Sequence, residues 1–158
     1  LYASLPPRCL LTAIYPRLYP YASADERPAP PLALSWAAMR SSGCRLFLLD
    51  AYLVLFVYLA APPAGAPPDA PPVEFPPSKQ SVLWRHVGKI KAAQLQTPKV
   101  VVCRAGTADG AAFEAHLIED LPEAGAGGYT FQQFVDWNQQ ELQGCIEEHR
   151  AGGAPQDD

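Results

Sequence analysis

The side chains best suited to catalysis or metal binding are scattered along the chain. The cysteines and histidines form neither a C-x-x-C pair nor a paired Cys/His motif; they are Cys9, Cys44, Cys103, Cys145, His86, His116 and His149. A structural zinc site needs closely spaced thiolates or imidazoles. We therefore expect no metal site in this segment, and we expect the cysteines to be free thiols in a cytosolic protein.

The acidic pair Glu119-Asp120 is the best candidate for acid–base chemistry in a predicted element. Neighbouring side chains on a helix point about 100° apart, so these two carboxylates do not converge as a catalytic acid and base must. The sequence also contains neither a G-x-S-x-G nucleophile motif nor a GxxxxGK[ST] phosphate loop. We predict that this segment is not an enzyme, and we expect His116 at the edge of a core.

Composition limits the partners of the chain. Its 158 residues suffice for one domain with a hydrophobic core, and its net charge is −4. An acidic chain has no general attraction for nucleic acid or anionic lipid, so no nucleic-acid partner is predicted. No charged-then-apolar leader follows Leu1, and we expect a fragment of a longer protein rather than a secreted precursor.

The most apolar stretch, Leu46 to Ala61, predicts two buried strands joined at Asp50-Ala51-Tyr52. Its Leu, Phe, Val and Tyr residues suit a pleated, buried surface. The alternative is a membrane-bound segment, which would make the chain a small peripheral membrane protein. A bilayer span needs about 20 apolar residues, and this stretch is shorter and contains a carboxylate. We therefore favour the two strands.

Further elements follow from periodicity. Ser35 is predicted to cap a short helix that ends near Arg40. Ser81 to Gln96 predicts an amphipathic helix, and Val100 to Cys103 is typical of a central strand that is covered on both faces. Ala108 to Asp120 predicts another helix, and Thr130 begins a last one with a capping-box pattern.

These elements predict an α+β domain: a small mixed β-sheet flanked by helices. Residues 26–148 are expected to form the α+β domain. Nearly every second residue of 62–77 is proline, which predicts an exposed, disordered insertion, and the polar residues 149–158 predict a disordered tail.

Three stretches resemble a known family. Gly43 to Leu59 resembles the paired strands of a gelsolin-like repeat, whose Y-L-L-D-x-G turn matches Asp50, with Tyr52 in the place of the turn glycine. Val100 to Asp120 is similar to a strand and helix of the COPII inner coat (the Sec twenty-three/twenty-four superfamily). The matching residues are Arg104, Gly106, Phe113, Leu117, Ile118, Glu119 and Asp120, followed by Tyr129 and Phe134 of a final helix.

Upstream, Ile14 to Tyr19 followed by Leu32 to Ser35 looks like the junction between the helical domain and the gelsolin-like domain of this coat, which implies that residues 1–25 end an upstream helical domain. The resemblance implies a C-terminal gelsolin-like domain of a COPII inner-coat subunit, of the cargo-adaptor type. It implies a non-catalytic interaction module in endoplasmic reticulum to Golgi transport. The implied partners are the GTPase-activating subunit and other coat components, cargo through upstream domains, and the endoplasmic reticulum membrane peripherally. The implied location is cytoplasmic, on exit sites and COPII vesicles. No cofactor is implied here, because the zinc ribbon of the family would lie upstream.

A gelsolin or villin-type repeat that binds actin and calcium is the alternative with the same fold. In such repeats a calcium-binding aspartate comes shortly before the first strand of the hairpin. Alignment on Asp50 places Arg45 there. Calcium requires carboxylate and carbonyl oxygens, so a cation at this position favours the coat over the actin-binding repeat.

Overall fold

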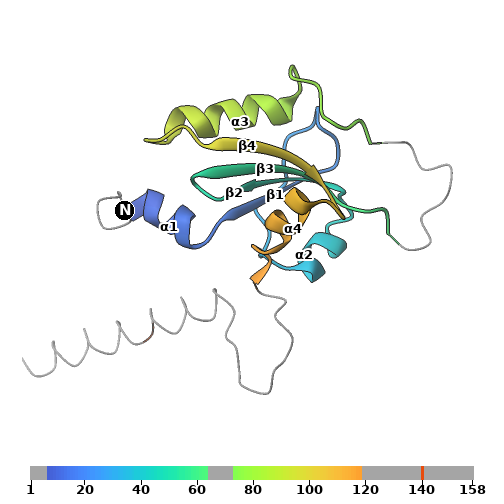
Figure 1. The fold of residues 1–158 in the computed structure, drawn as a ribbon, viewed down its shortest axis with the longest axis horizontal. Coiled ribbons are helices and arrows are strands. Elements are labelled where there is room, and N and C mark those ends of the chain that lie inside the picture. The colour runs from blue at the N-terminus through green and yellow to red at the C-terminus, as the bar shows by residue number, and fades with distance from the viewer. Residues whose placement is uncertain (1–6, 64–72, 119–139, 141–158) are drawn as a thin grey trace, which may run out of the picture. The chain divides into compact units, whose positions relative to one another are not determined.

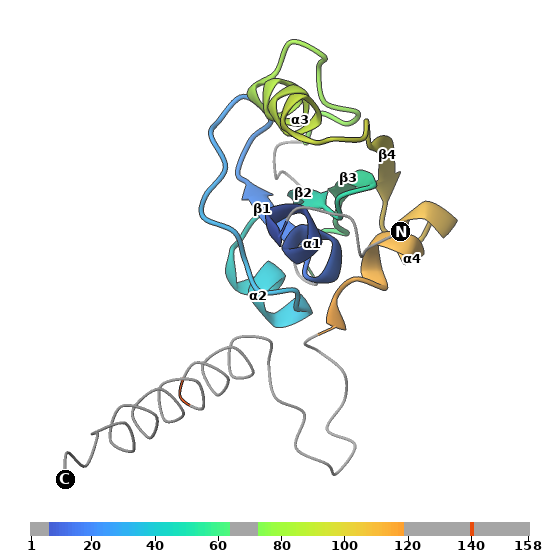
Figure 2. The same cartoon turned by 90° about the vertical axis from the view of Figure 1, so that its left-hand side faces the viewer.

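The computed structural model describes residues 7–63, 73–118 and 140, and the fold belongs to the unit Leu1–Asp120 (Figure 1). A four-stranded sheet in the order β1-β2-β3-β4 lies at its centre. Helix α3 covers one face of this sheet, and α2 and α4 lie on the other face (Figures 1 and 2). The predicted α+β class, a small mixed sheet with flanking helices, is confirmed.

The predicted hairpin is present as β2 (Leu46–Asp50) and β3 (Val54–Leu59), which pair antiparallel. Their turn is held locally, because the Asp50 carboxylate accepts a hydrogen bond of 3.1 Å from the Tyr52 N–H. Tyr52 has a φ of 64°, the left-handed conformation that glycine adopts most easily. In this turn a buried tyrosine thus adopts a conformation that favours glycine, at the position where the resembling motif has glycine.

Strand β1 (Arg17–Tyr21) is an element that the sequence does not predict. It pairs antiparallel with β2 at one edge of the sheet, so residues 17–21 form part of the same sheet rather than only the end of an upstream domain. The strand could not be recognised in the sequence because it contains Pro20, and proline is rare in strands. Proline cannot donate to a ladder, but an edge strand has one side without a partner and tolerates it.

Strand β4 (Lys99–Arg104) pairs parallel with β3 and forms the other edge of the described sheet. The prediction of a central strand is wrong on this point. Its apolar run has another cause: Val100 and Val102 pack on the α3 side, whereas Val101 and Cys103 pack on the other side. Cover on both faces makes a run apolar whether or not a further strand follows.

Helix α3 (Val82–Ala93) follows the N-cap Ser81, where the predicted helix starts, and ends before the predicted Gln96. Its residues Leu83 and Val87 pack against the sheet. Helix α2 (Trp36–Ser41) has the predicted cap Ser35. Helix α4 (Ala108–Glu114) is shorter than predicted, and α1 (Pro7–Ile14) precedes the sheet. In the part of the chain that the structure describes, no helix is both long and apolar enough to cross a bilayer.

The end of the proline-rich segment packs against the domain, which differs from the predicted exposed insertion. Phe75 is half-buried beside the core under α3, and the carbonyl oxygen of buried Pro77 accepts a hydrogen bond of 3.0 Å from the indole of Trp84. Arg104 donates a hydrogen bond of 2.9 Å to the Phe75 carbonyl oxygen. Residues 64–72 of this segment, the predicted last helix and the predicted tail lie outside the described residues, except for Gln140.

Candidate interaction site

The predicted residues Phe113 and Leu117 lie in the core between α4 and the sheet. Phe113 is fully buried and Leu117 is 6% exposed. The rings of Phe113 and Tyr58 are stacked with centroids 4.0 Å apart, and the Tyr58 hydroxyl donates a hydrogen bond of 2.9 Å to the Glu114 carboxylate. These two motif residues therefore hold α4 on the sheet, and His116 lies beside them, half-buried against Phe56.

Arg104 and Gly106 form the connection between β4 and α4. Gly106 has a φ of 79°, so the turn requires the left-handed conformation. The Thr107 hydroxyl donates to the carbonyl oxygen of Arg104 and accepts from the N–H of Gly110, which caps α4. The position of Arg104 at this turn places its guanidinium 4.9 Å from the Phe75 ring.

Of the remaining motif residues, the structure describes only Ile118, which is exposed. Ile118 directly follows the buried Leu117 and is 46% exposed, which suits a contact with another molecule or chain segment. Glu119, Asp120, Tyr129 and Phe134 lie outside the described residues. Their roles remain predictions.

Asp50 lies at the opposite end of the sheet from Arg104 and is not part of the α4 group. The pairing register places Asp50 beside Leu55 near the start of β3, whereas Arg104 pairs with Leu59 at its end. Asp50 is only 6% exposed and lines a hollow of about 370 Å³ between α1, β1 and α3. One carboxylate oxygen accepts from both the Tyr52 N–H and the Gln94 amide, the latter at 2.9 Å.

Burial raises the pKa of Asp50, although the hydrogen bonds from Tyr52 and Gln94 and the charges of Arg17 and His86 act in the other direction. The pKa of His86 is lowered by burial and by Lys89, and Asp50 opposes this shift. Among the described residues that line this hollow, Asp50 is the single carboxylate. The arrangement does not form a two-carboxylate acid–base site.

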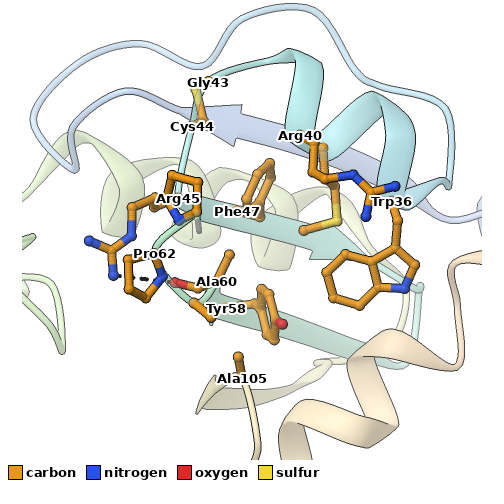
Figure 3. A pocket seen from close by; sticks show the side chains of 13 residues that line it. Trp36, Arg40, Gly43, Cys44, Arg45, Phe47, Tyr58, Ala60, Pro62 and Ala105 are labelled. Atoms are coloured by element: carbon orange, nitrogen blue, oxygen red, sulfur yellow. Dashed lines mark hydrogen bonds between the residues drawn. The ribbon is translucent and has the colours of Figure 1, made fainter. Parts of the chain in front are cut away.

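An apolar pocket of about 360 Å³ lies on the other face of the sheet, between α2 and the open end of the hairpin (Figure 3). Phe47 of β2 and Tyr58 of β3 are cross-strand partners and point into it, and Trp36 and Met39 of α2 form one wall. Arg45 lies at the rim and donates to the carbonyl oxygen of Ala60 at 3.4 Å. This pocket can receive an apolar side chain but contains no nucleophile–base pair.

Cysteines and possible metal ligands are the remaining chemically reactive groups of the described residues. Burial raises the pKa of the Cys103 thiol to about 11, and the nearby Asp109 and Glu114 add to this, so Cys103 is a protonated core thiol at neutral pH. The described cysteines Cys9, Cys44 and Cys103 are free. Within residues 7–63 and 73–118, no three His, Cys, Asp or Glu side chains are grouped as a metal site requires.

The apolar pocket and the hollow beside Asp50 are sites that the sequence does not predict. Trp36, Phe47 and Tyr58 are separated in the sequence, and their convergence depends on the packing of α2 across the hairpin. The one available signal was the capped helix beginning after Ser35, because its short length leaves the end of the hairpin uncovered. The hollow beside Asp50 depends on β1, which is itself unpredicted.

The four-stranded mixed sheet with its flanking helices is that of a gelsolin-like α+β domain. No family model matches the chain. The chain is similar to protein transport protein SEC23 D of Arabidopsis thaliana, with 36% identity over 137 residues. The match covers 87% of this chain but only 18% of that protein. This similarity supports the interpretation that the chain is a segment of a Sec twenty-three/twenty-four superfamily protein, as the motifs indicate. It does not support the cargo-adaptor type, because the similar protein is named SEC23 D.

Proposed function

We propose that this chain is a gelsolin-like interaction module of a COPII inner-coat subunit that acts in transport from the endoplasmic reticulum to the Golgi. The observation that carries the proposal is the 36% identity to SEC23 D across nearly the whole chain. The gelsolin-like sheet and the packing of Phe113 and Leu117 agree with the motifs that suggest the same coat. The module binds other coat components, and its location is the cytoplasmic surface of exit sites and vesicles.

The proposed mechanism is binding without catalysis. The core residues Phe113 and Leu117 fix α4, and this places the exposed Ile118 at the surface. The apolar pocket between α2 and the hairpin offers a second contact for a partner side chain. Cofactor binding and cargo selection are assigned to other parts of the subunit, as the motif resemblance implies.

The subunit type has two candidates. The cargo-adaptor type follows from the L-I-E-D residues that end with Glu119 and Asp120, and from the final helix with Tyr129 and Phe134. The SEC23 type follows from the name of the similar protein. An actin- and calcium-binding repeat is a further alternative with the same fold, and Arg45 at the expected position of a calcium ligand argues against it.

Flotation with a reconstituted coat tests the proposal. COPII coat components are assembled on liposomes, the purified chain is added, and the floated fraction is analysed. We expect the chain to float with coated liposomes and not with bare liposomes. The Ile118→Asp variant tests whether Ile118 contributes to the contact, since the change lies on the surface. A folded chain that stays in the soluble fraction, or that binds actin in a calcium-dependent manner instead, would contradict the proposal.

A further inference from the structure

A basic groove lies between α3 and the segment that follows β1, on a chain that is acidic as a whole. Its lining consists of Asp25, Arg27, Pro28, Val82, Arg85, His86 and Lys89. The helix contributes positions i, i+3, i+4 and i+7, which share one side of α3. The opposite wall is the segment that follows β1. Three permanent cations and one histidine therefore surround a hollow in which Asp25 is the one lining carboxylate.

The two walls of this groove are joined by the fold. The N–H of Leu83 donates a hydrogen bond of 2.9 Å to the carbonyl oxygen of Ala24, which ties the start of α3 to the segment after β1. Figures 1 and 2 both show this segment beside α3. Leu83 and Val87 anchor the helix on the sheet, so the cations are presented from a fixed element.

His86 lines the groove and is held by two neighbouring tyrosines. Its Nδ1 lies 2.7 Å from the Tyr21 hydroxyl, and its ring packs edge-on against Tyr19 with centroids 4.8 Å apart. Arg27, Arg85 and Lys89 are exposed, and none of them makes an ion pair within the described part of the chain. Their charges are thus available to a ligand.

We propose that this groove binds an acidic peptide segment of a partner protein. The hollow measures about 850 Å³, which is room for several side chains of an extended segment. Carboxylates placed along it would meet Arg27 on one wall and Arg85 and Lys89 on the other, in charge-assisted hydrogen bonds. The inference goes beyond the coat assignment and stands independently of it.

A peptide agrees better with the groove than an anionic membrane does. A bilayer surface is flat, whereas these cations surround a hollow. Membrane-surface binding also relies on apolar side chains that enter the interface. The large exposed apolar residues of the described chain lie elsewhere, and none of them lines the groove; they are Leu11, Ile14, Leu95 and Ile118.

Fluorescence polarisation with a labelled peptide of alternating glutamate and serine tests this proposal. We expect saturable binding that weakens with added salt, and no binding of the matched glutamine–serine peptide. The double variant Arg85→Gln, Lys89→Gln removes two groove cations and is expected to raise Kd about tenfold, the effect of roughly 1.4 kcal/mol.

The matched control is the double variant Lys91→Gln, Lys99→Gln, which makes the same change in net charge with two cations that do not line the groove. We expect it to raise Kd less than about threefold, since long-range attraction to exposed charges is screened. Equal loss in both variants would show attraction to net charge alone and overturn the proposal. Absence of peptide binding, or binding only to phosphatidylserine vesicles, would overturn it as well.

Discussion

Asp50 shows how one residue can hold a turn and carry an electrostatic cost at once. One of its oxygens accepts both the Tyr52 N–H and the Gln94 amide, which connects the hairpin turn to the end of α3. The side chain is nearly inaccessible, and burial disfavours its charged form. The hydrogen bonds need the oxygen but not the charge.

The Asp50→Asn variant separates these two contributions. Asparagine keeps an accepting oxygen and has no charge. Because burial raises the folded-state pKa of Asp50 above its unfolded value near 3.9, the folded wild type binds the proton more tightly. The contribution of Asp50 to the free energy of unfolding of the wild type therefore falls as the pH rises above about 4. We expect the stability of Asp50→Asn relative to wild type to rise over the same range.

Denaturant unfolding at a series of pH values measures this difference. Comparison with wild type at each pH largely removes the contribution of the histidines, since both proteins contain them. A relative stability of Asp50→Asn that falls as the pH rises would mean that attraction from Arg17 and His86 outweighs burial.

Leu117 and Ile118 form a natural pair of a buried and an exposed motif residue. Leu117→Asp places an unpaired charge in the core beside Phe113, so we expect a loss of at least about 3 kcal/mol in the free energy of unfolding. Ile118→Asp alters a side chain that is 46% exposed and is expected to change stability by about 0.5 kcal/mol or less. Thermal unfolding of both variants tests this, and equal losses would be inconsistent with the observed burial.

For individual residues, the sequence predicts burial in the core better than it predicts an unusual backbone conformation. The spacing of Phe113 and Leu117 is a helical repeat, so their burial could be predicted locally. The left-handed conformation of Tyr52 could not be predicted from residue preference, since tyrosine rarely adopts it. It is imposed by the turn, and the resemblance to a glycine-containing motif was the available signal.

At the scale of elements, two glycines on helices differ in what surrounds them. Gly88 is exposed in the middle of α3, with open space where a Cβ would lie. Gly110 lies in the first turn of α4, where a Cβ would collide with the carbonyl oxygen of Arg104. The first glycine weakens its helix, whereas the second allows α4 to approach β4.

The same added methyl group is therefore expected to have opposite effects. Gly88→Ala should stabilise the protein by about 0.5–1 kcal/mol, because alanine has the higher helix propensity. Gly110→Ala should destabilise it by about 1–3 kcal/mol, because backbone must move. Urea unfolding of the two variants measures both changes. Destabilisation by Gly88→Ala, or none by Gly110→Ala, would contradict the packing described for these helices.

Helices and the hairpin could be predicted because their signals are local. Ser35 caps α2 as the sequence predicts, α3 begins next to the predicted start at Ser81, and Asp50-Ala51-Tyr52 separates two apolar runs. Strand order could not be predicted in the same way. Pro20 makes the sequence of β1 look unlike a strand. The apolar run from Val100 to Cys103 arises because β4 is covered on both faces, although β4 lies at the edge of the described sheet.

At the scale of the molecule, the described part of Leu1–Asp120 presents separate surfaces around one sheet. The apolar pocket beside α2 and the basic groove beside α3 lie on opposite faces, and the exposed Ile118 follows α4. Such a distribution suits a module with more than one neighbour in an assembly. The pocket and groove depend on the packing of segments distant in sequence, so they could be recognised only from the fold.

Displacement in the flotation assay tests whether this module occupies a place in the COPII inner coat. Full-length SEC23 D is added in increasing amount to coated liposomes that carry the labelled chain. We expect the floated chain to decrease as it is replaced by the protein to which it is similar over 87% of its length. Displacement by a cargo-adaptor subunit instead would assign that subunit type. Flotation that neither subunit reduces, at saturating concentrations, would contradict the account.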